Sequence, residues 1–198
     1  MDIGHAVRNV FLGMPTLLTG GIPGARAGDE RLAYSHIDAP ETLTIASDAF
    51  EAGDTIPRRY TADWDNISPP LKWSAMPAET ASVVLMVEDP DAPTPNPFVH
   101  WMVYNLAPAT RTLPEGIAPP PNKFDQPEGF MQGKNSTLRL GYTGAAPPRG
   151  DLPHHYHFQL FALDKVLETA PGAGRSELSK AMKGHVLAKG RLIGVYQR

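Results

Sequence analysis

The sequence predicts a β-rich, loop-rich single domain, and three observations support that fold class. The 198 residues include 21 prolines and 18 glycines. Because a proline inside a helix costs about 3 kcal/mol, this composition disfavours a helix bundle. Several apolar runs have the length of buried strands rather than of long helices. Proline-rich segments separate those runs, as is typical of turns and loops.

Five segments have the residue patterns of strands. Residues 43–46 alternate in side-chain character, which indicates a strand with two different faces. Continuous apolar runs at 82–87, 99–106 and 156–163 indicate central strands that are buried on both faces. A shorter run at 191–196 predicts one more strand. These segments account for the expected sheet structure.

One later segment is predicted to be helical. Residues 176–183 have a helical pattern that begins with Ser176 as an N-cap and ends at Gly184. Residues 107–140, in contrast, form a long irregular stretch. Loops of that length are commonly functional or mobile.

The first forty residues differ from the rest, and we expect two units. Residues 1–40 are predicted to be a partly helical N-terminal extension, and residues 41–198 to be the folded domain. A secretion signal is disfavoured because Gly13 and Pro15 interrupt the apolar run, so we expect a cytoplasmic protein. No segment has the roughly 18 apolar residues of a membrane span. The apolar side chains of residues 3–18 favour a homodimer.

Composition excludes several classes of chemistry. The chain has no cysteine, which removes disulfide scaffolds, thiol nucleophiles and cysteine zinc sites. Its net charge of −3 provides no electrostatic footprint for nucleic acid or for an anionic membrane surface. The glycine-rich nucleotide loops and the serine nucleophile elbow are also missing from the sequence. We therefore expect no cofactor and no catalytic residue.

Acidic and histidine side chains gather at the ends of the predicted central strands. Asp89 and Asp91 end the strand that begins at residue 82, and His100 begins the next. Residues 154–157 contain three more histidines at the start of a third strand. Because neighbouring strand ends meet at one edge of a sheet, these groups are candidates for a common pocket.

Strand alternation predicts which way these side chains face. Asp89 is expected to share a face with Val87, and His100 to share one with Met102. In the third strand, His154 and Tyr156 share a face. His157 is then expected on the opposite face.

Other interpretations of the same residues stay open. The Asp89–Pro93 segment is a good turn former, and a histidine at the start of an apolar strand is often a satisfied core residue. Metal binding is an alternative, because His155 and His157 share a strand face. A metal-dependent β-barrel enzyme that uses His100, His155 and His157 is the corresponding alternative function.

Three segments together resemble one protein family. The first is Asp65–Trp73 (DNISPPLKW), and the second is Asp89–Pro93 (DPDAP) followed by the pair His100-Trp101. The third is Gly141–Tyr156, which contains GYTGAAPPRG and HHY. In this order they resemble motifs of the phosphatidylethanolamine-binding protein family, also called Raf-kinase-inhibitor-like, in its bacterial branch. The resemblance covers residues 42–198.

The resemblance implies a fold and a pocket. The fold would be a central antiparallel β-sheet packed on a smaller second sheet, with a few peripheral helices. A small pocket at one end of the sheet would take an anion. Carried over by position, its ligand-binding residues are Asp89, Asp91, Pro93, His100, Trp101, Pro148, His154 and Tyr156. His155 stands where the family commonly has arginine, so the site is expected to be less basic.

The implied ligand is a small anion, such as a phosphoryl head group of a phospholipid or a carboxylate. In this interpretation Asp89 lies beside His100 and fixes the tautomer of its imidazole. The Tyr156 hydroxyl and the amides of residues 141–150 would supply further donors. The resemblance therefore predicts a non-enzymatic binding or regulatory protein. A regulator that acts on a protein partner, as kinase or protease inhibitors do, is the remaining alternative.

Overall fold

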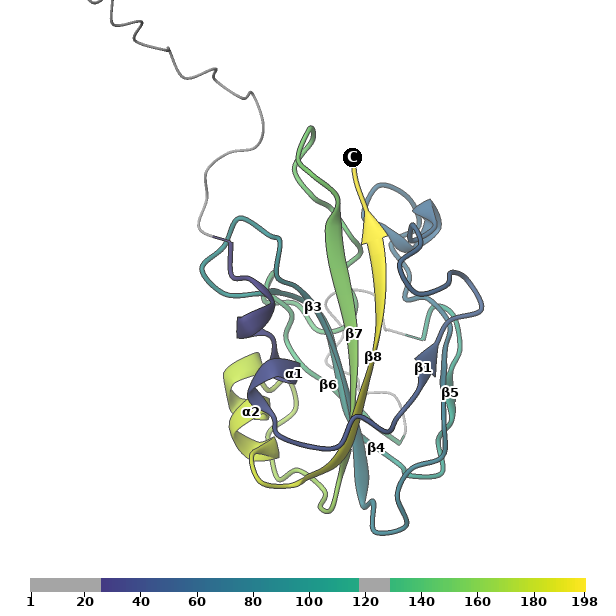
Figure 1. The fold of residues 1–198 in the computed structure, drawn as a ribbon, viewed down its shortest axis with the longest axis vertical. Helices are drawn as coiled ribbons and strands as arrows, with labels where there is room; N and C mark the ends of the chain where they lie inside the picture. The colour runs from purple at the N-terminus through teal and green to yellow at the C-terminus, as the bar shows by residue number, and fades with distance from the viewer. Residues whose placement is uncertain (1–25, 118–128) are drawn as a thin grey trace, which may run out of the picture.

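The computed structural model describes residues 26–117 and 129–198, and this part forms two antiparallel sheets (Figure 1). The large sheet has the strand order β6-β4-β3-β7-β8. Its strands are β3 (Ser82–Asp89), β4 (Phe98–Leu106), β6 (Met131–Gln132), β7 (His154–Leu163) and β8 (Val186–Tyr196). The small sheet has the order β1-β2-β5, with β1 (Ile45–Ala46), β2 (Leu71–Trp73) and β5 (Thr112–Leu113). The predicted mainly β fold class is confirmed.

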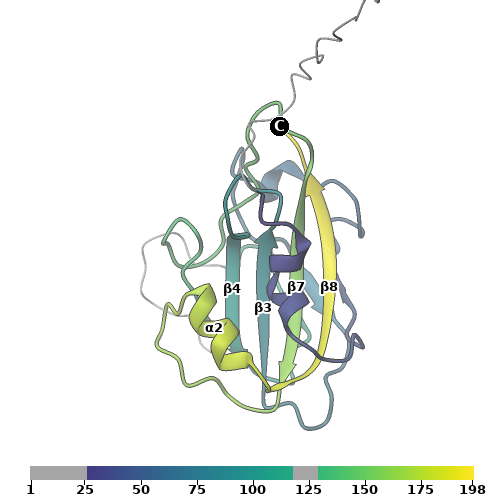
Figure 2. The same cartoon turned by 60° about the vertical axis from the view of Figure 1, so that its left-hand side comes forward.

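Helices are few and lie beside the large sheet. The two α-helices are α1 (Ala33–His36) and α2 (Arg175–Met182), and two short 3-10 helices are η1 (Asp29–Arg31) and η2 (Arg58–Tyr60). Figure 2 shows α1 and α2 covering one face of the strands β4, β3 and β7. Of the predicted extension, residues 1–25 lie outside the described residues. In the ranges that the structure describes, no helix is long and apolar enough to cross a membrane.

Both faces of the large sheet are buried, which explains the continuous apolar runs. Val83, Leu85 and Val87 belong to the core that also contains the small sheet. Val84 and Met86 point the other way, into the core that contains the two α-helices. Because successive strand residues alternate between faces, a strand with two cores needs apolar side chains at every position.

Strand β3 ends in two adjacent buried acids that face opposite cores. Glu88 is fully buried on the helix side, where its carboxylate accepts hydrogen bonds from the amide of Ala33 (2.9 Å) and from Gln159 (2.8 Å). Arg175 of α2 forms an ion pair with the same carboxylate. These contacts satisfy the buried charge. Glu88 therefore fixes α1 and α2 against the sheet, while the side chain of Asp89 lies on the opposite face.

Helix α2 begins differently from the prediction. Its N-cap is Gly174 and not Ser176, and no side chain caps the helix. Gly174 has extended backbone angles (φ −84°, ψ 169°), as N-cap residues usually have. The predicted end is close to the observed one, because the helix stops at Met182 and Gly184 follows with a φ of 80°.

Strand β4 contains a bulge that changes the direction of His100. Val87 of β3 pairs with Trp101, whereas the next residue, Glu88, pairs with Val99. His100 is therefore an extra residue in β4 and shares the face of Trp101. The predicted common face of His100 and Met102 is wrong, because alternation does not continue through a bulge. Met102 lies in the opposite core.

A glycine in β8 permits close packing of the chain that leads into β1. Gly190 lies so close to Leu43 that a Cβ atom on it would be 2.1 Å from the Leu43 carbonyl oxygen. The backbone there is held by a hydrogen bond from Leu43 N–H to the Lys189 carbonyl (3.1 Å). A side chain at position 190 would therefore push backbone against backbone.

Replacement of Gly190 by alanine should destabilise the protein. We expect Gly190→Ala to lower the free energy of unfolding by about 2 kcal/mol or more, as overpacked cores do. The measurement is the urea midpoint at constant slope. Gly174→Ser is the matched control, because nothing lies within 4 Å of its Cβ position, and serine is a good N-cap. Equal midpoints for the two variants would contradict this account of β8.

Candidate functional site

A small pocket lies at the end of the large sheet, where β3 and β4 approach β7. Its volume is about 320 Å³. The residues predicted from the sequence that line it are Asp89, Pro93, His100, Pro148 and His154. Apolar side chains and two proline-rich loops form most of the remaining wall, from Ala92, Phe98, Ala146 and Pro147. We call this the His100 pocket.

Asp89 organises the loop that follows β3. One oxygen, Oδ1, accepts hydrogen bonds from the amides of Asp91 (2.8 Å) and Ala92 (3.0 Å). The other, Oδ2, lies 2.8 Å from Nδ1 of His154. The predicted hydrogen bond between Asp89 and His100 is therefore wrong, because the imidazole that bonds to Asp89 is that of His154. Asp89 thus holds the Asp-Pro-Asp turn and the start of β7 together.

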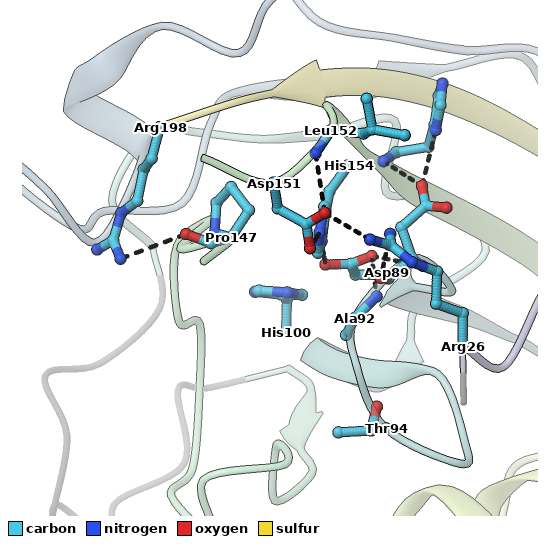
Figure 3. Close-up of polar contacts among 12 residues, drawn as sticks. Arg26, Asp89, Ala92, Thr94, His100, Pro147, Asp151, Leu152, His154 and Arg198 are labelled. Carbon is cyan, nitrogen blue, oxygen red and sulfur yellow. Dashed lines mark hydrogen bonds and ion pairs between the residues drawn. The ribbon is translucent and has the colours of Figure 1, made fainter. Parts of the chain in front are cut away.

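His154 lies between two carboxylates. Its Nε2 atom is 3.3 Å from Oδ2 of Asp151, while Nδ1 contacts Asp89. Figure 3 shows these three side chains together with Arg26 in one cluster above His100. Arg26 donates to Oδ1 of Asp151 (2.6 Å) and to the carbonyl of Asp91 (2.7 Å). Two carboxylates, one guanidinium and one imidazole therefore form a single connected network.

The network favours the charged form of His154. Burial pushes the pKa of this imidazole down, but the hydrogen bonds with Asp89 and Asp151 and the charges of Asp89 and Asp91 outweigh burial and raise it above 6.5. Burial raises the pKa of Asp151, but its hydrogen bonds with the Leu152 amide, His154 and Arg26 outweigh burial and leave it below its usual value. A doubly donating imidazolium fits the two carboxylate contacts.

His100 has a different environment. Its Nδ1 atom lies 2.7 Å from the Thr143 carbonyl, so Nδ1 carries the proton and donates it. Its ring packs edge-on against Tyr156, with the ring centres 5.0 Å apart, and against Phe98 at 4.8 Å. Burial lowers the pKa of His100, helped by the charge of His154, and the opposing effects of Asp89 and of the Thr143 and Gly144 backbone are smaller. In the neutral ring, Nε2 is therefore the acceptor nitrogen.

Three predicted residues lie near the pocket without lining it. Asp91 points to the rim, where its Oδ2 accepts from the amide and the Nδ1 of His155 (2.9 and 2.7 Å). Trp101 is buried behind the pocket and donates to Gln132 (2.7 Å). The Tyr156 hydroxyl is buried beside the backbone of Ala146 and forms no aligned hydrogen bond with the described residues. Burial strongly raises the pKa of this hydroxyl.

The loop amides contribute less to the pocket than expected. The Gly144 amide donates to Asn66 (2.6 Å), and the Thr143 amide donates to the His100 carbonyl (2.9 Å). The Thr143 amide therefore holds the loop against β4, and the Gly144 amide holds it against the segment before β2. The polar side chains that line the pocket are those of Asp89, Thr94, His100, Thr137, Thr143 and His154.

The structure does not bring the three histidines of the metal alternative together. His100 lines the pocket, whereas His155 is exposed and paired with Asp91. His157 faces the helix side, where Nε2 is 3.7 Å from Asp29. Across residues 26–117 and 129–198, no group of three metal-ligating side chains is found.

Sequence reasoning missed two charged residues of the site. Asp151 follows the proline-rich loop, and only its distance of three residues from His154 could have indicated the contact. Arg26 is 125 residues from Asp151 in the chain. Neither its type nor its neighbours indicate where it packs, since its position depends on the folded N-terminal segment. The Gly28 amide donates to the Pro90 carbonyl (3.2 Å) and fixes that segment beside the turn.

Fold and site together define a two-sheet β protein with a small aspartate- and histidine-lined pocket at one sheet end. The family model described as phosphatidylethanolamine-binding protein matches residues 46–197. The chain therefore belongs to the phosphatidylethanolamine-binding protein family. The resemblance recognised in the three sequence motifs is confirmed.

The chain is similar to proteins of archaea and bacteria over most of its length. A UPF0098 protein of Pyrococcus horikoshii is 41% identical over 192 residues, which cover 96% of this chain and 95% of the relative. One of Methanothermobacter thermautotrophicus is 42% identical over 156 residues, or 79% of this chain and 99% of the relative. A solved structure described as a putative phosphatidylethanolamine-binding protein homologue, from Chlamydia trachomatis, is 38% identical, with a TM-score of 0.70. It covers 79% of this chain and 97% of its own.

The two pocket histidines should titrate in opposite directions. In ring NMR spectra, we expect the pKa of His154 to lie above 6.5 and that of His100 to lie below it. Asp89→Asn should lower the pKa of His154, because it removes the hydrogen-bonded charge. Asp164→Asn is the matched control, since that exposed carboxylate contacts His185 instead.

The same shift has a consequence for stability. Because the pKa of His154 is higher in the folded state, the contribution of this residue to the free energy of unfolding is complete below the unfolded pKa of 6.5. The contribution is lost as pH rises through the folded pKa. A His154 ring that titrates below 6.5, or titrates identically in Asp89→Asn, would contradict the network.

Proposed function

We propose that this chain is a non-enzymatic binding protein whose His100 pocket takes a small ligand with a phosphoryl or carboxylate group. The observation that carries the proposal is the geometry of His100, a buried neutral imidazole that lines the pocket, with Nδ1 bonded to the Thr143 carbonyl and no aligned hydrogen bond from Nε2 to the described residues. Family membership supports a ligand-binding role. The described pocket wall offers no activated nucleophile, so binding is the function that its side chains support.

The size and lining of the pocket favour a small ligand with an apolar part. A volume of about 320 Å³ is at the lower end of ligand sites. Phe98, Pro93 and Pro147 can contact carbon atoms, while His100 contacts the polar end. Prolines stiffen the wall, so little conformational entropy is lost on binding. A head-group-sized phosphomonoester such as phosphoethanolamine fits these limits.

The protonation of His100 determines how an anion can bind. Nε2 of the neutral ring is an acceptor, and two acceptors repel when a fully deprotonated anion approaches. One proton must therefore lie between Nε2 and the ligand oxygen, contributed either by an imidazolium or by the ligand. Phosphomonoesters have a second pKa of about 6 and can bring that proton themselves. Binding is consequently linked to the uptake of one proton at neutral pH.

Phosphoethanolamine affinity should decrease as pH rises. Between pH 5 and 8 we expect the association constant to fall, approaching about tenfold per pH unit above the pKa values of both partners. Calorimetry in buffers of different ionisation enthalpy should also give close to one proton taken up per ligand at pH 7.5. His100→Gln should weaken binding at pH 5.5 by about tenfold or more, because the imidazole that shares a proton with the ligand is lost.

The matched control for this experiment is His185→Gln. That histidine is exposed and pairs with Asp164, and it does not line the pocket. We expect wild-type affinity and the wild-type pH profile from it. The proposal would be overturned by an affinity that does not change between pH 5 and 8, or by His100→Gln binding as well as the control.

A further inference from the structure

A second polar cavity lies on the other side of the loop that bounds the His100 pocket. Its volume is about 470 Å³. Pro147 and Pro148 line the His100 pocket, whereas the next residue, Arg149, lines this second cavity. Figure 1 shows the end of β8 and the loop before β7 at the same end of the molecule. The other charged residues of the lining are Arg58, Asp63 and Arg198, and we call the site the arginine cavity.

One of its arginines is neutralised by the acid. Arg198 binds Asp63 through two nitrogens, with Nη2 2.6 Å from Oδ1 and Nε 2.9 Å from Oδ2. The Tyr196 hydroxyl also donates to Oδ2 (3.1 Å). These hydrogen bonds, chiefly those of Arg198, lower the pKa of Asp63. The pair is therefore fully ionised, and its two charges cancel.

Two guanidinium groups in the cavity have no such partner. Among residues 26–117 and 129–198, neither Arg58 nor Arg149 forms an ion pair with a carboxylate. Arg58 instead lies over the ring of Trp64, 5.2 Å from the ring centre. The charge of Arg149 contributes to lowering the pKa of Asp63, so it acts within the same cavity. The charged side chains of the lining thus leave two positive charges uncompensated.

We propose that the arginine cavity is a second binding site, separate from the His100 pocket, for one phosphoryl group. A guanidinium presents parallel N–H donors that match two oxygens of a phosphate, and its charge does not depend on pH near neutrality. Two such groups match the charge of a phosphomonoester dianion, which is about −1.5 to −2 at pH 7. Two uncompensated cations are enough for a single phosphoryl group. A polyanion would in addition be repelled by the net charge of −3 on the whole chain.

The two sites differ in what they require of the ligand. The His100 pocket needs a proton between its imidazole and the ligand, whereas the arginine cavity supplies permanent donors. Binding in the arginine cavity should therefore not weaken between pH 6 and 8, where phosphate becomes more negative. This difference lets one experiment distinguish the sites.

Trp64 provides a direct probe of the cavity. Its side chain is 62% exposed, whereas Trp73 and Trp101 are buried. Inorganic phosphate that draws Arg58 toward the cavity should change the contact with the indole ring and so change tryptophan fluorescence. The experiment is a titration of the full chain with inorganic phosphate at low ionic strength, because salt screens exposed charges. NMR signals of the Nε–H groups of Arg58 and Arg149 provide a second readout.

Paired variants test the assignment. The double variant Arg58→Gln with Arg149→Gln should weaken phosphate binding by about tenfold or more, as expected when charge-assisted hydrogen bonds are lost. Lys180→Gln with Lys183→Gln on α2 is the matched control, because it removes the same charge elsewhere on the surface. His100→Gln should keep the fluorescence response even if it abolishes binding in the other pocket. A failure of the proposal for one site can therefore be distinguished from a failure of the proposal for the other.

The phosphoryl group could come from a soluble phosphate or from a lipid head group. Vesicles of phosphatidylcholine with and without phosphatidic acid separate the two sources. Binding to phosphatidic acid vesicles that inorganic phosphate competes away would assign a lipid, and a phosphate response without vesicle binding would assign a soluble ligand. The proposal is overturned if neither probe shifts the arginine signals, or if the double arginine variant responds as the lysine control does.

Discussion

The contact of His154 with Asp89 and Asp151 is the interaction on which the site depends. It joins the end of β3, the start of β7 and the loop between the two cavities through one buried imidazole. A buried charge is costly unless it is paired and hydrogen-bonded, and here each carboxylate has several donors. Asp89 also accepts the amides of its own turn, and Arg26 neutralises Asp151. The pocket wall is therefore held by charge pairing rather than by apolar contact alone.

The same strand end organises both faces of the sheet. Glu88 and Asp89 are neighbours in the chain, but alternation turns one toward the helices and the other toward the pocket. Arg175 approaches Glu88 on one side, and His154 approaches Asp89 on the other. Two acids in sequence thus attach the N-terminal segment, α2 and β7 to a single strand. A small domain gains rigidity at this end of the sheet because each buried carboxylate has fixed partners.

In the proposed function, anions are bound by local chemistry and not by the overall electrostatic field of the molecule. A net charge of −3 does not attract anions from a distance. We propose that the His100 pocket binds an anion through a proton shared with the ligand. The arginine cavity would bind one through two guanidinium groups that pair with no carboxylate of the described residues. Pro147 and Pro148 line the His100 pocket and the next residue, Arg149, lines the arginine cavity, so consecutive residues of one loop belong to two different cavities.

The sequence by itself determined the fold class, the central strands and five of the pocket residues. Apolar runs buried on both faces have a clear pattern. The motif residues Asp89, His100 and His154 lie at or near the ends of neighbouring strands, which meet at one edge of the sheet. The tertiary structure alone decided which imidazole pairs with Asp89. The bulge at His100 adds one residue to β4, and such an insertion leaves no trace in the alternation that sequence reasoning uses. Arg26 also required the folded chain, because a contact across 125 residues depends on packing and not on local spacing.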